Sequence, residues 1–369
     1  MIKKITNEFQ LLFSFKGKKT KWQKPLLTTF SIGLPLLLGL YFDNLQYGLS
    51  ACLSGLIIIY LPESGTFTNR ILTLLICSFG FMVSSAIGYI FSFKPLVSIV
   101  AFGVFSMTVH WITLFYKTAP PRSFFFILIA AMTICQPFDI ELIPIKVGLM
   151  ALGTMLTLTS ALIYLFILSL RQIKTKNKII PIFEKNTSAD IWETLIYGAI
   201  MSIALAIGHI FELNNPYWIP ISSAAVMQGA SLYQIRQRMF QRILGTFVGI
   251  GFTWVLFYFI DFNPLLICVT IIILQLAIEM LIVKQYAVAV VFITPFTILL
   301  NEAANPLFQT PNTLIALRLE EIIIGSILGA IGGWLLYKEK IRYASINKIE
   351  SLINNDHTTN FKRNAGRSE

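Results

Sequence analysis

Seven ionisable residues lie inside otherwise apolar stretches of this sequence. A charge at the centre of a bilayer costs about 3 kcal/mol or more, so we expect such side chains to face the interior of a helix bundle or a water-filled cavity. Basic groups there can bind an anion, and carboxyl or imidazole groups there can carry a proton. The seven residues are His110, Lys146, His209, Glu279, Arg318, Glu320 and Glu321.

Lys146 and Arg318 occupy matching places in the two halves of the chain. Each lies seven residues before a glycine, Gly153 or Gly325, and a little inside the predicted outer end of its apolar run. Two cations that meet between the halves would suit a carboxylate. The alternative is that both side chains extend to the outer lipid headgroups.

Four residues are candidates for coupling to protons. Glu320 and Glu321 neighbour Arg318, so they either neutralise it or one of them carries a proton. Adjacent helical residues point about 100° apart, so both cannot face one cavity equally. His110 and Glu279 correspond at an offset of 169 and are the other two candidates. Structural polar packing is the alternative for each.

Three arginines, Arg236, Arg238 and Arg242, lie between two apolar runs, on a predicted cytoplasmic turn. Arg238 and Arg242 are four residues apart, so they share one face of the helix that follows. A positive mouth there would attract anions, and topological anchoring is the alternative. Trp218 fits an interfacial aromatic belt, or a surface on which an aromatic substrate stacks.

Helices that cross a membrane must position these residues. Of 369 residues, 56% are hydrophobic and 13% charged, against roughly 25% charged in soluble domains. The apolar runs are continuous and about 20 residues long, which indicates helices. We expect an all-α polytopic bundle of twelve spans, with the fifth longer than its apolar run and the second and eighth tilted or broken. The spans are Pro25–Tyr41, Tyr47–Leu61, Ile71–Phe93, Pro95–Phe115, Ser123–Cys135, Leu142–Leu170, Ile191–Phe211, Tyr217–Gly229, Ile243–Ile260, Pro264–Val283, Gln285–Leu300 and Thr313–Tyr337.

The basic residues indicate the orientation of the chain. Of 29 Lys and Arg, 26 fall in the tails, the central loop or the alternate loops on the same side. The positive-inside rule then places both termini in the cytoplasm of a bacterial cell whose inner membrane holds the protein. The net charge of +11 is explained by this topology, so we expect no nucleic-acid partner. Residues 1–24 form a basic amphipathic tail on the inner leaflet, 171–190 a cytoplasmic linker and 338–369 a cytoplasmic tail.

The halves, residues 25–170 and 191–337, follow one plan. "RILTLLIC" begins at Arg70 and "RILGTFVG" at Arg242, at an offset of 172, while "FKP" and "FNP" match at 169. Six spans per half predict parallel repeats about an axis along the membrane normal, with a substrate path between them. Duplication without function is the alternative. Gly325 and Gly329 predict close helix packing in the last span.

No motif for covalent or metal catalysis is present. The sequence lacks GxxxxGK[ST], HExxH, GxSxG and any Cys/His ligand cluster, and its four cysteines are scattered in apolar runs. We therefore expect neither an enzyme nor a bound cofactor or metal.

Three stretches resemble the fusaric-acid-resistance-like (FUSC) integral membrane transporters: "YWIPISSAAVMQGASLYQIRQRMFQRILGTFVG" from Tyr217, "KQYAVAVVFITPFTILL" from Lys284, and "RLEEIIIGSILGAIGGWLL" from Arg318. The resemblance is strong over 215–337 and weaker over the first half. It implies export of aromatic carboxylic acids or other organic anions, driven by an ion gradient. Larger members carry a soluble domain, whereas only the short linker 171–190 joins the halves here. The resemblance leaves two kinds of protein partner to be tested, a periplasmic adaptor and a second copy of the chain.

Three functions follow from these observations. The leading one is a secondary exporter in which Lys146 and Arg318 bind the carboxylate and Glu321 or Glu279 carries protons. The second is a passive anion channel, which shares the cationic path but needs no protonatable carboxylate. The third is a membrane accessory subunit that transports nothing.

Overall fold

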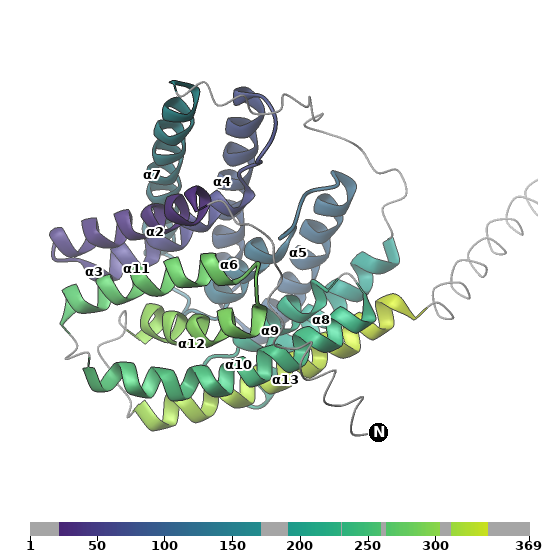
Figure 1. The fold of residues 1–369 in the computed structure, drawn as a ribbon. Coiled ribbons are helices and arrows are strands. Elements are labelled where there is room, and N and C mark those ends of the chain that lie inside the picture. Colours follow the sequence, from purple (N-terminus) through teal and green to yellow (C-terminus); the bar gives the residue numbers. More distant parts are fainter. Residues whose placement is uncertain (1–21, 171–190, 230, 260–262, 303–310, 339–369) are drawn as a thin grey trace, which may run out of the picture.

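The fold is given by a computed structural model that describes residues 22–170, 191–229, 231–259, 263–302 and 311–338. Regular structure in these residues is entirely helical, which confirms the all-α bundle (Figure 1). The predicted linker 171–190 and nearly all of both predicted tails lie outside the described residues. The helices are α2 Gln23–Tyr41, α3 Leu45–Cys52, the 3-10 helix η1 Leu53–Tyr60, α4 Phe67–Ile90, α5 Pro95–Phe115, α6 Phe124–Ile134, α7 Ile143–Leu170, α8 Ile191–Ile210, α9 Trp218–Met227, α10 Leu232–Phe259, α11 Pro264–Leu281, α12 Tyr286–Glu302 and α13 Pro311–Tyr337.

Eight of these helices are long and apolar enough to cross a membrane, so the protein is a multi-pass membrane protein. The other four predicted spans are short: α3 with η1, then α6, α9 and α12. They are the second and fifth spans of each predicted half. The second span is broken as expected, because its helix changes to 3-10 geometry at Leu53. The expectation of a longer fifth span was wrong, since α6 has 11 residues.

The predicted turn at the three arginines was also wrong. Helix α10 begins at Leu232, so Arg236, Arg238 and Arg242 all lie within it. The side chain of Ser231 accepts a hydrogen bond from the Gln234 N–H at this start. No glycine or proline follows before the apolar part of the helix, so the backbone has no reason to break. Arg70 is likewise helical, because α4 begins at Phe67 and Thr66 caps it.

The helices of the two halves pack in corresponding pairs. In the first half α4 packs against α6 and α7, and α2 packs against α7 and α3. In the second half α10 packs against α12 and α13, and α8 packs against α13 and α9. Figure 1 shows α4 and α7 upright in the view and α10 and α13 running across it, so the long helices of the halves are inclined to one another. The twofold repeat itself stays a prediction.

The halves meet through three helix contacts among the described residues: α2 with α11, α5 with α8, and α6 with α9. Gly33 of α2 faces Ile272 of α11, where a Cβ would lie 3.1 Å from the isoleucine side chain. Gly103 of α5 faces Ser202 of α8, whose hydroxyl donates to the Ile99 carbonyl at 3.2 Å. A glycine in each of these two contacts lets the helices approach closely.

The small-residue face of α13 packs as predicted. A Cβ on Gly325 would collide with the Ile219 carbonyl of α9, and one on Gly329 would lie 2.6 Å from the Ser223 carbonyl. The Ser223 hydroxyl donates to the Gly325 carbonyl at 2.7 Å. This contact holds α9 against α13 and so determines which face of α9 points to the interior of the bundle.

Candidate binding cavity

A cavity of about 770 Å³ lies between the two halves. Each of the four short spans contributes a row of side chains to its wall. On α9 the row is Trp218, Ile221, Ala225 and Gln228, at the three-and-four spacing of one helix face. The other rows are Leu53, Leu56 and Ile59 of η1, Phe124, Phe125, Leu128 and Met132 of α6, and Tyr286, Ile293, Phe296, Thr297 and Leu300 of α12.

The charged lining residues belong to segments on one predicted side of the membrane. They come from the starts of α2, α4 and α10, the segment before α4 and the end of α11, all of which the predicted topology assigns to the cytoplasmic side. The remaining wall is largely apolar and aromatic, so the cavity is amphipathic. Its size is that of small-molecule sites in proteins. Four charged lining residues are basic and two are acidic: Lys24, Arg70, Arg238 and Arg242, with Glu63 and Glu279.

Arg70 and Arg242 are buried without a carboxylate partner among the described residues. Their exposed fractions are 6% and 5%. One guanidinium nitrogen of Arg70 donates to the Glu63 carbonyl at 2.8 Å, and one of Arg242 donates to the Tyr286 hydroxyl at 3.2 Å. The Nε atom of each is buried and makes no hydrogen bond within the described residues. Neither forms an ion pair with any described carboxylate.

Arg238 lines the cavity beside Arg242, as their shared helix face predicted. It donates to the Ala225 carbonyl at 3.1 Å and to Gln228 Oε1 at 3.3 Å. Its guanidinium also lies 5.2 Å from the Tyr286 ring centre. Tyr286 therefore contacts both arginines and orients them at the same end of the cavity. Arg236 points elsewhere and is exposed.

Lys24 interacts electrostatically with both acidic lining residues, Glu63 and Glu279. Lys24 donates to the carbonyls of Ile59 and Leu61 at 2.8 and 3.1 Å. Glu279 accepts a hydrogen bond from Gln275 Nε2 at 3.2 Å. Sequence reasoning placed Lys24 in the basic tail and missed its role, although Lys24 directly precedes the predicted span at Pro25.

Arg318 is not a lining residue of the cavity, but it contacts two residues that are. It is 6% exposed, its guanidinium lies 3.2 Å from the Trp218 ring centre, and it donates to Thr297 Oγ1 at 2.5 Å. Trp218 and Thr297 both line the cavity. Glu321, which interacts electrostatically with Arg318, is 1% exposed and accepts the Asn215 N–H at 3.1 Å.

The structure separates two pairs that the sequence placed together. Glu320 is exposed whereas Glu321 is buried, as the helical geometry of adjacent residues requires. Lys146 is half-buried, and its ammonium lies 5.0 Å from the Tyr89 ring centre, outside the cavity lining. The described contacts do not bring Lys146 to Arg318, because α7 and α13 each pack against helices of their own half. That they bind one anion together stays a prediction.

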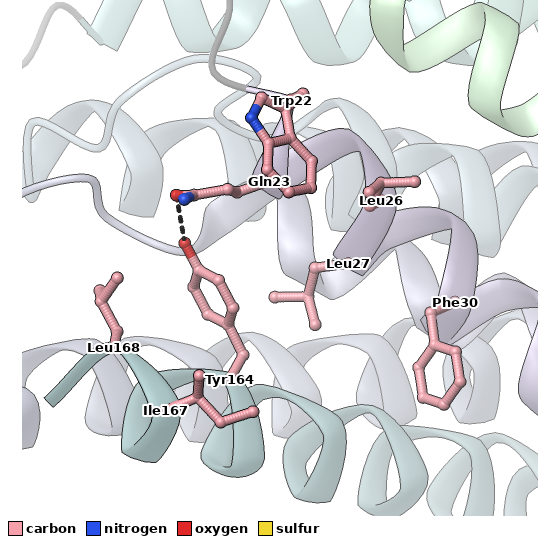
Figure 2. Close-up of a pocket in the computed structure, with 8 residues that line it drawn as sticks. All are labelled: Trp22, Gln23, Leu26, Leu27, Phe30, Tyr164, Ile167 and Leu168. Carbon is pink, nitrogen blue, oxygen red and sulfur yellow. Dashed lines mark hydrogen bonds between the residues drawn. The ribbon is translucent and has the colours of Figure 1, made fainter. Parts of the chain in front are cut away.

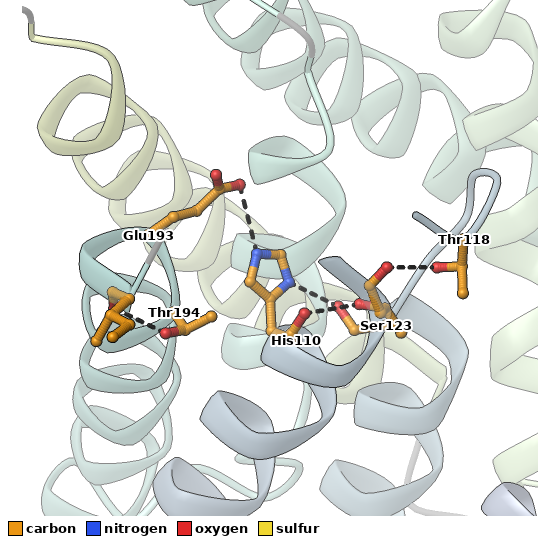
Figure 3. A network of polar contacts seen from close by, with 7 residues as sticks. His110, Thr118, Ser123, Glu193 and Thr194 are labelled. Atoms are coloured by element: carbon orange, nitrogen blue, oxygen red, sulfur yellow. Dashed lines mark hydrogen bonds and ion pairs between the residues drawn. The ribbon is translucent and has the colours of Figure 1, made fainter. Parts of the chain in front are cut away.

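His110 lies in a polar network away from the cavity lining (Figure 3). It is 6% exposed, and its ring stacks on Tyr197 with the ring centres 3.9 Å apart. Its Nδ1 lies 2.9 Å from Ser123 Oγ, and its Nε2 lies 3.5 Å from Glu193 Oε1. Glu193 was not predicted, because a carboxylate in the first turn of a helix is ordinary in sequence terms.

A second, smaller cleft of about 280 Å³ lies between α2 and α7 (Figure 2). Tyr164 donates to Gln23 Oε1 there at 3.3 Å. None of the described residues that line this cleft is charged, so the larger cavity is the candidate site. The lining residues are Trp22, Gln23, Leu26, Leu27, Phe30, Tyr164, Ile167 and Leu168.

Comparisons with known proteins agree with the expected family over the second half. Residues 203–332 match the family model described as fusaric acid resistance protein-like. The chain is similar to the uncharacterized membrane protein YvaC of Bacillus subtilis (strain 168), with 32% identity over 161 residues. This region is 44% of the chain but spans only 25% of the relative's length. No solved structure matches.

Proposed function

We propose that this chain, whose residues 203–332 match the fusaric acid resistance protein-like family, is a secondary transporter that exports organic anions. Aromatic carboxylic acids are the favoured class of substrate. The transporter lies in a bacterial inner membrane with both termini in the cytoplasm. The observation that carries the proposal is the pair of buried arginines, Arg70 and Arg242, which face one amphipathic cavity without a carboxylate partner among the described residues.

A buried charge that lacks a counter-ion is costly, so a group of opposite charge binds favourably beside it. A carboxylate matches the paired donors of a guanidinium and gains charge-assisted hydrogen bonds from it. Arg70 and Arg242 line the cavity, so their guanidinium groups are placed to supply such bonds. Phe124, Phe296 and Trp218 offer flat apolar surfaces to the rest of the ligand. An anion with an aromatic body therefore complements both parts of the wall.

Arg318 with Trp218 forms a second station for the anion, at the end predicted to face outward. The substrate would move from the arginines of α4 and α10 towards this stacked pair. We assign proton coupling to two carboxyl groups: Glu321, which is buried beside Arg318, and Glu279, which is half-buried beside Lys24. Each lies next to a cation, so a change in its charge alters the field that the substrate meets.

A deletion strain tests this function directly. Cells without the gene are grown with a panel of aromatic and aliphatic carboxylic acids, and the intracellular concentration of each acid is measured. We expect greater sensitivity and higher accumulation for at least one aromatic acid, restored by the wild-type gene, and no change for the matched neutral amides. Equal accumulation of every acid in both strains would contradict export. Accumulation unaffected by an uncoupler would indicate a passive channel instead.

A further inference from the structure

Two of the three contacts between the halves, α2 with α11 and α5 with α8, correspond position by position. Gly33 faces Ile272 where α2 meets α11, and Ser202 faces Gly103 where α8 meets α5. Gly33 corresponds to Ser202, and Gly103 to Ile272, both at the offset of 169 in the numbering. The same offset aligns "FKP" with "FNP". Each helix contact therefore has its counterpart on the other side of the molecule.

A polar couple stands at each of these contacts. Lys24 of α2 interacts electrostatically with Glu63, in the segment before α4, and with Glu279 of α11. Glu193 of α8 lies 3.5 Å from His110 of α5. The offset of 169 again relates Lys24 to Glu193 and His110 to Glu279. The two couples occupy equivalent places, but their charges are exchanged. Helix α2 carries the cation, Lys24, whereas its equivalent α8 carries the anion, Glu193.

Each couple is also tied to one of the short helices that line the cavity. Lys24 donates to the carbonyls of Ile59 and Leu61 at the end of η1. His110 is hydrogen-bonded to Ser123, the residue before α6. A change in either couple therefore acts on the contact between the halves and on the cavity wall together.

We propose that these couples are matched clamps between the halves, and that the proton on His110 switches only the clamp that it forms with Glu193. Lysine stays charged, whereas histidine changes charge between about pH 5 and 8. The His110–Glu193 clamp is thus an ion pair at low pH and loses its attraction as His110 becomes neutral. The Lys24–Glu279 clamp has no histidine, so it responds to the proton on Glu279, which we assign to coupling, and not to the proton on His110.

Among the groups around His110, Glu193 is the one whose charge interacts with a proton on the imidazole. Helix α8 presents Glu193 and Tyr197 to the imidazole, and the residue before α6 presents Ser123. Neither Tyr197 nor Ser123 carries a charge in this pH range. Arg122, next to Ser123, is exposed. The charge that protonated His110 meets across the contact is therefore that of Glu193.

Thermal unfolding of the purified full-length protein in detergent tests the switch. Glu193→Gln removes the anion, and Glu320→Gln, an exposed carboxylate on α13, is the matched control. At about pH 5 we expect Glu193→Gln to lower Tm by about 2 °C or more relative to wild type. At about pH 8 the difference should vanish. Glu320→Gln should show no such pH-dependent difference.

His110→Gln provides an independent variant, and it should remove the acid-specific advantage of wild type over Glu193→Gln. A Tm difference for Glu193→Gln that is equal at both pH values would overturn the switch. So would a pH-dependent difference that persists in the His110→Gln background. Because unfolding needs no substrate, a protein that transports nothing can still confirm or refute the clamp.

Discussion

The guanidinium of Arg318 lies 3.2 Å from the centre of the Trp218 ring. Arg318 comes from α13 and Trp218 from the start of α9, the two helices that the glycines of α13 bring together. Stacked on Trp218, Arg318 is buried in the protein and does not extend to the lipid headgroups. The ring in turn faces the cavity, so the cation acts on a bound anion through an aromatic wall.

Replacement of Trp218 should distinguish its stacking from its bulk. Trp218→Phe keeps a ring under Arg318, whereas Trp218→Ala removes it. A cation–π contact is worth roughly 0.5–2 kcal/mol, so we expect the alanine variant to lose about threefold or more in affinity for an aromatic acid, and the phenylalanine variant to lose less. Equilibrium binding in detergent measures both. Equal affinities for all three proteins would exclude Trp218 from the site.

Glycine-to-alanine changes test the packing of α13 against α9. Gly325→Ala places a methyl group against the Ile219 carbonyl, so we expect a loss of about 1–3 kcal/mol in stability. Gly251→Ala in α10 is the matched control, because no described atom lies within 4 Å of its added Cβ. There the better helix propensity of alanine should leave Tm unchanged or slightly raised. A Gly325→Ala variant as stable as the control would show that the helices are not in contact there.

Replacing each of the two adjacent glutamates by glutamine distinguishes a role in proton coupling from a mere contribution to surface charge. Glu321 is buried beside Arg318 and Glu320 is exposed. Glu321→Gln should abolish the response of anion flux to an imposed pH gradient, whereas Glu320→Gln should keep it. Flux of a radiolabelled aromatic acid into proteoliposomes, with and without an uncoupler, measures this. Coupled flux in the Glu321→Gln protein would move the proton site elsewhere, with Glu279 next to be tested.

The sequence predicts the spans well because bilayer thickness imposes a length that hydropathy can detect. It predicts the start of α10 badly, because hydropathy detects the apolar run and not the helix. The arginines interrupt the apolar run without interrupting the helix, since arginine is a good helix former. The extra turns matter, because they place Arg238 and Arg242 on a rigid helix at the cavity and not on a turn.

The partners of the ionisable residues are harder to predict than the residues themselves. The offset of 169 marks His110 and Glu279 as equivalents, but the partner of each comes from the other half of the chain. Lys146 and Arg318 match in sequence yet have different surroundings, one half-buried on Tyr89 and the other buried on Trp218. The position of a residue in the sequence does not show which neighbouring helix packs against its face.

Anion flux through proteoliposomes that contain the wild type, Arg70→Gln or Arg242→Gln tests the central claim most directly. Arg236→Gln is the control, since Arg236 shares α10 with Arg242 but is exposed. A lost charge-assisted hydrogen bond costs about 1.5–3 kcal/mol. We therefore expect each buried-arginine variant to lower kcat/KM for an aromatic carboxylate by about tenfold or more, with flux through Arg236→Gln unchanged. Wild-type flux in both buried-arginine variants would contradict an anion path through the cavity.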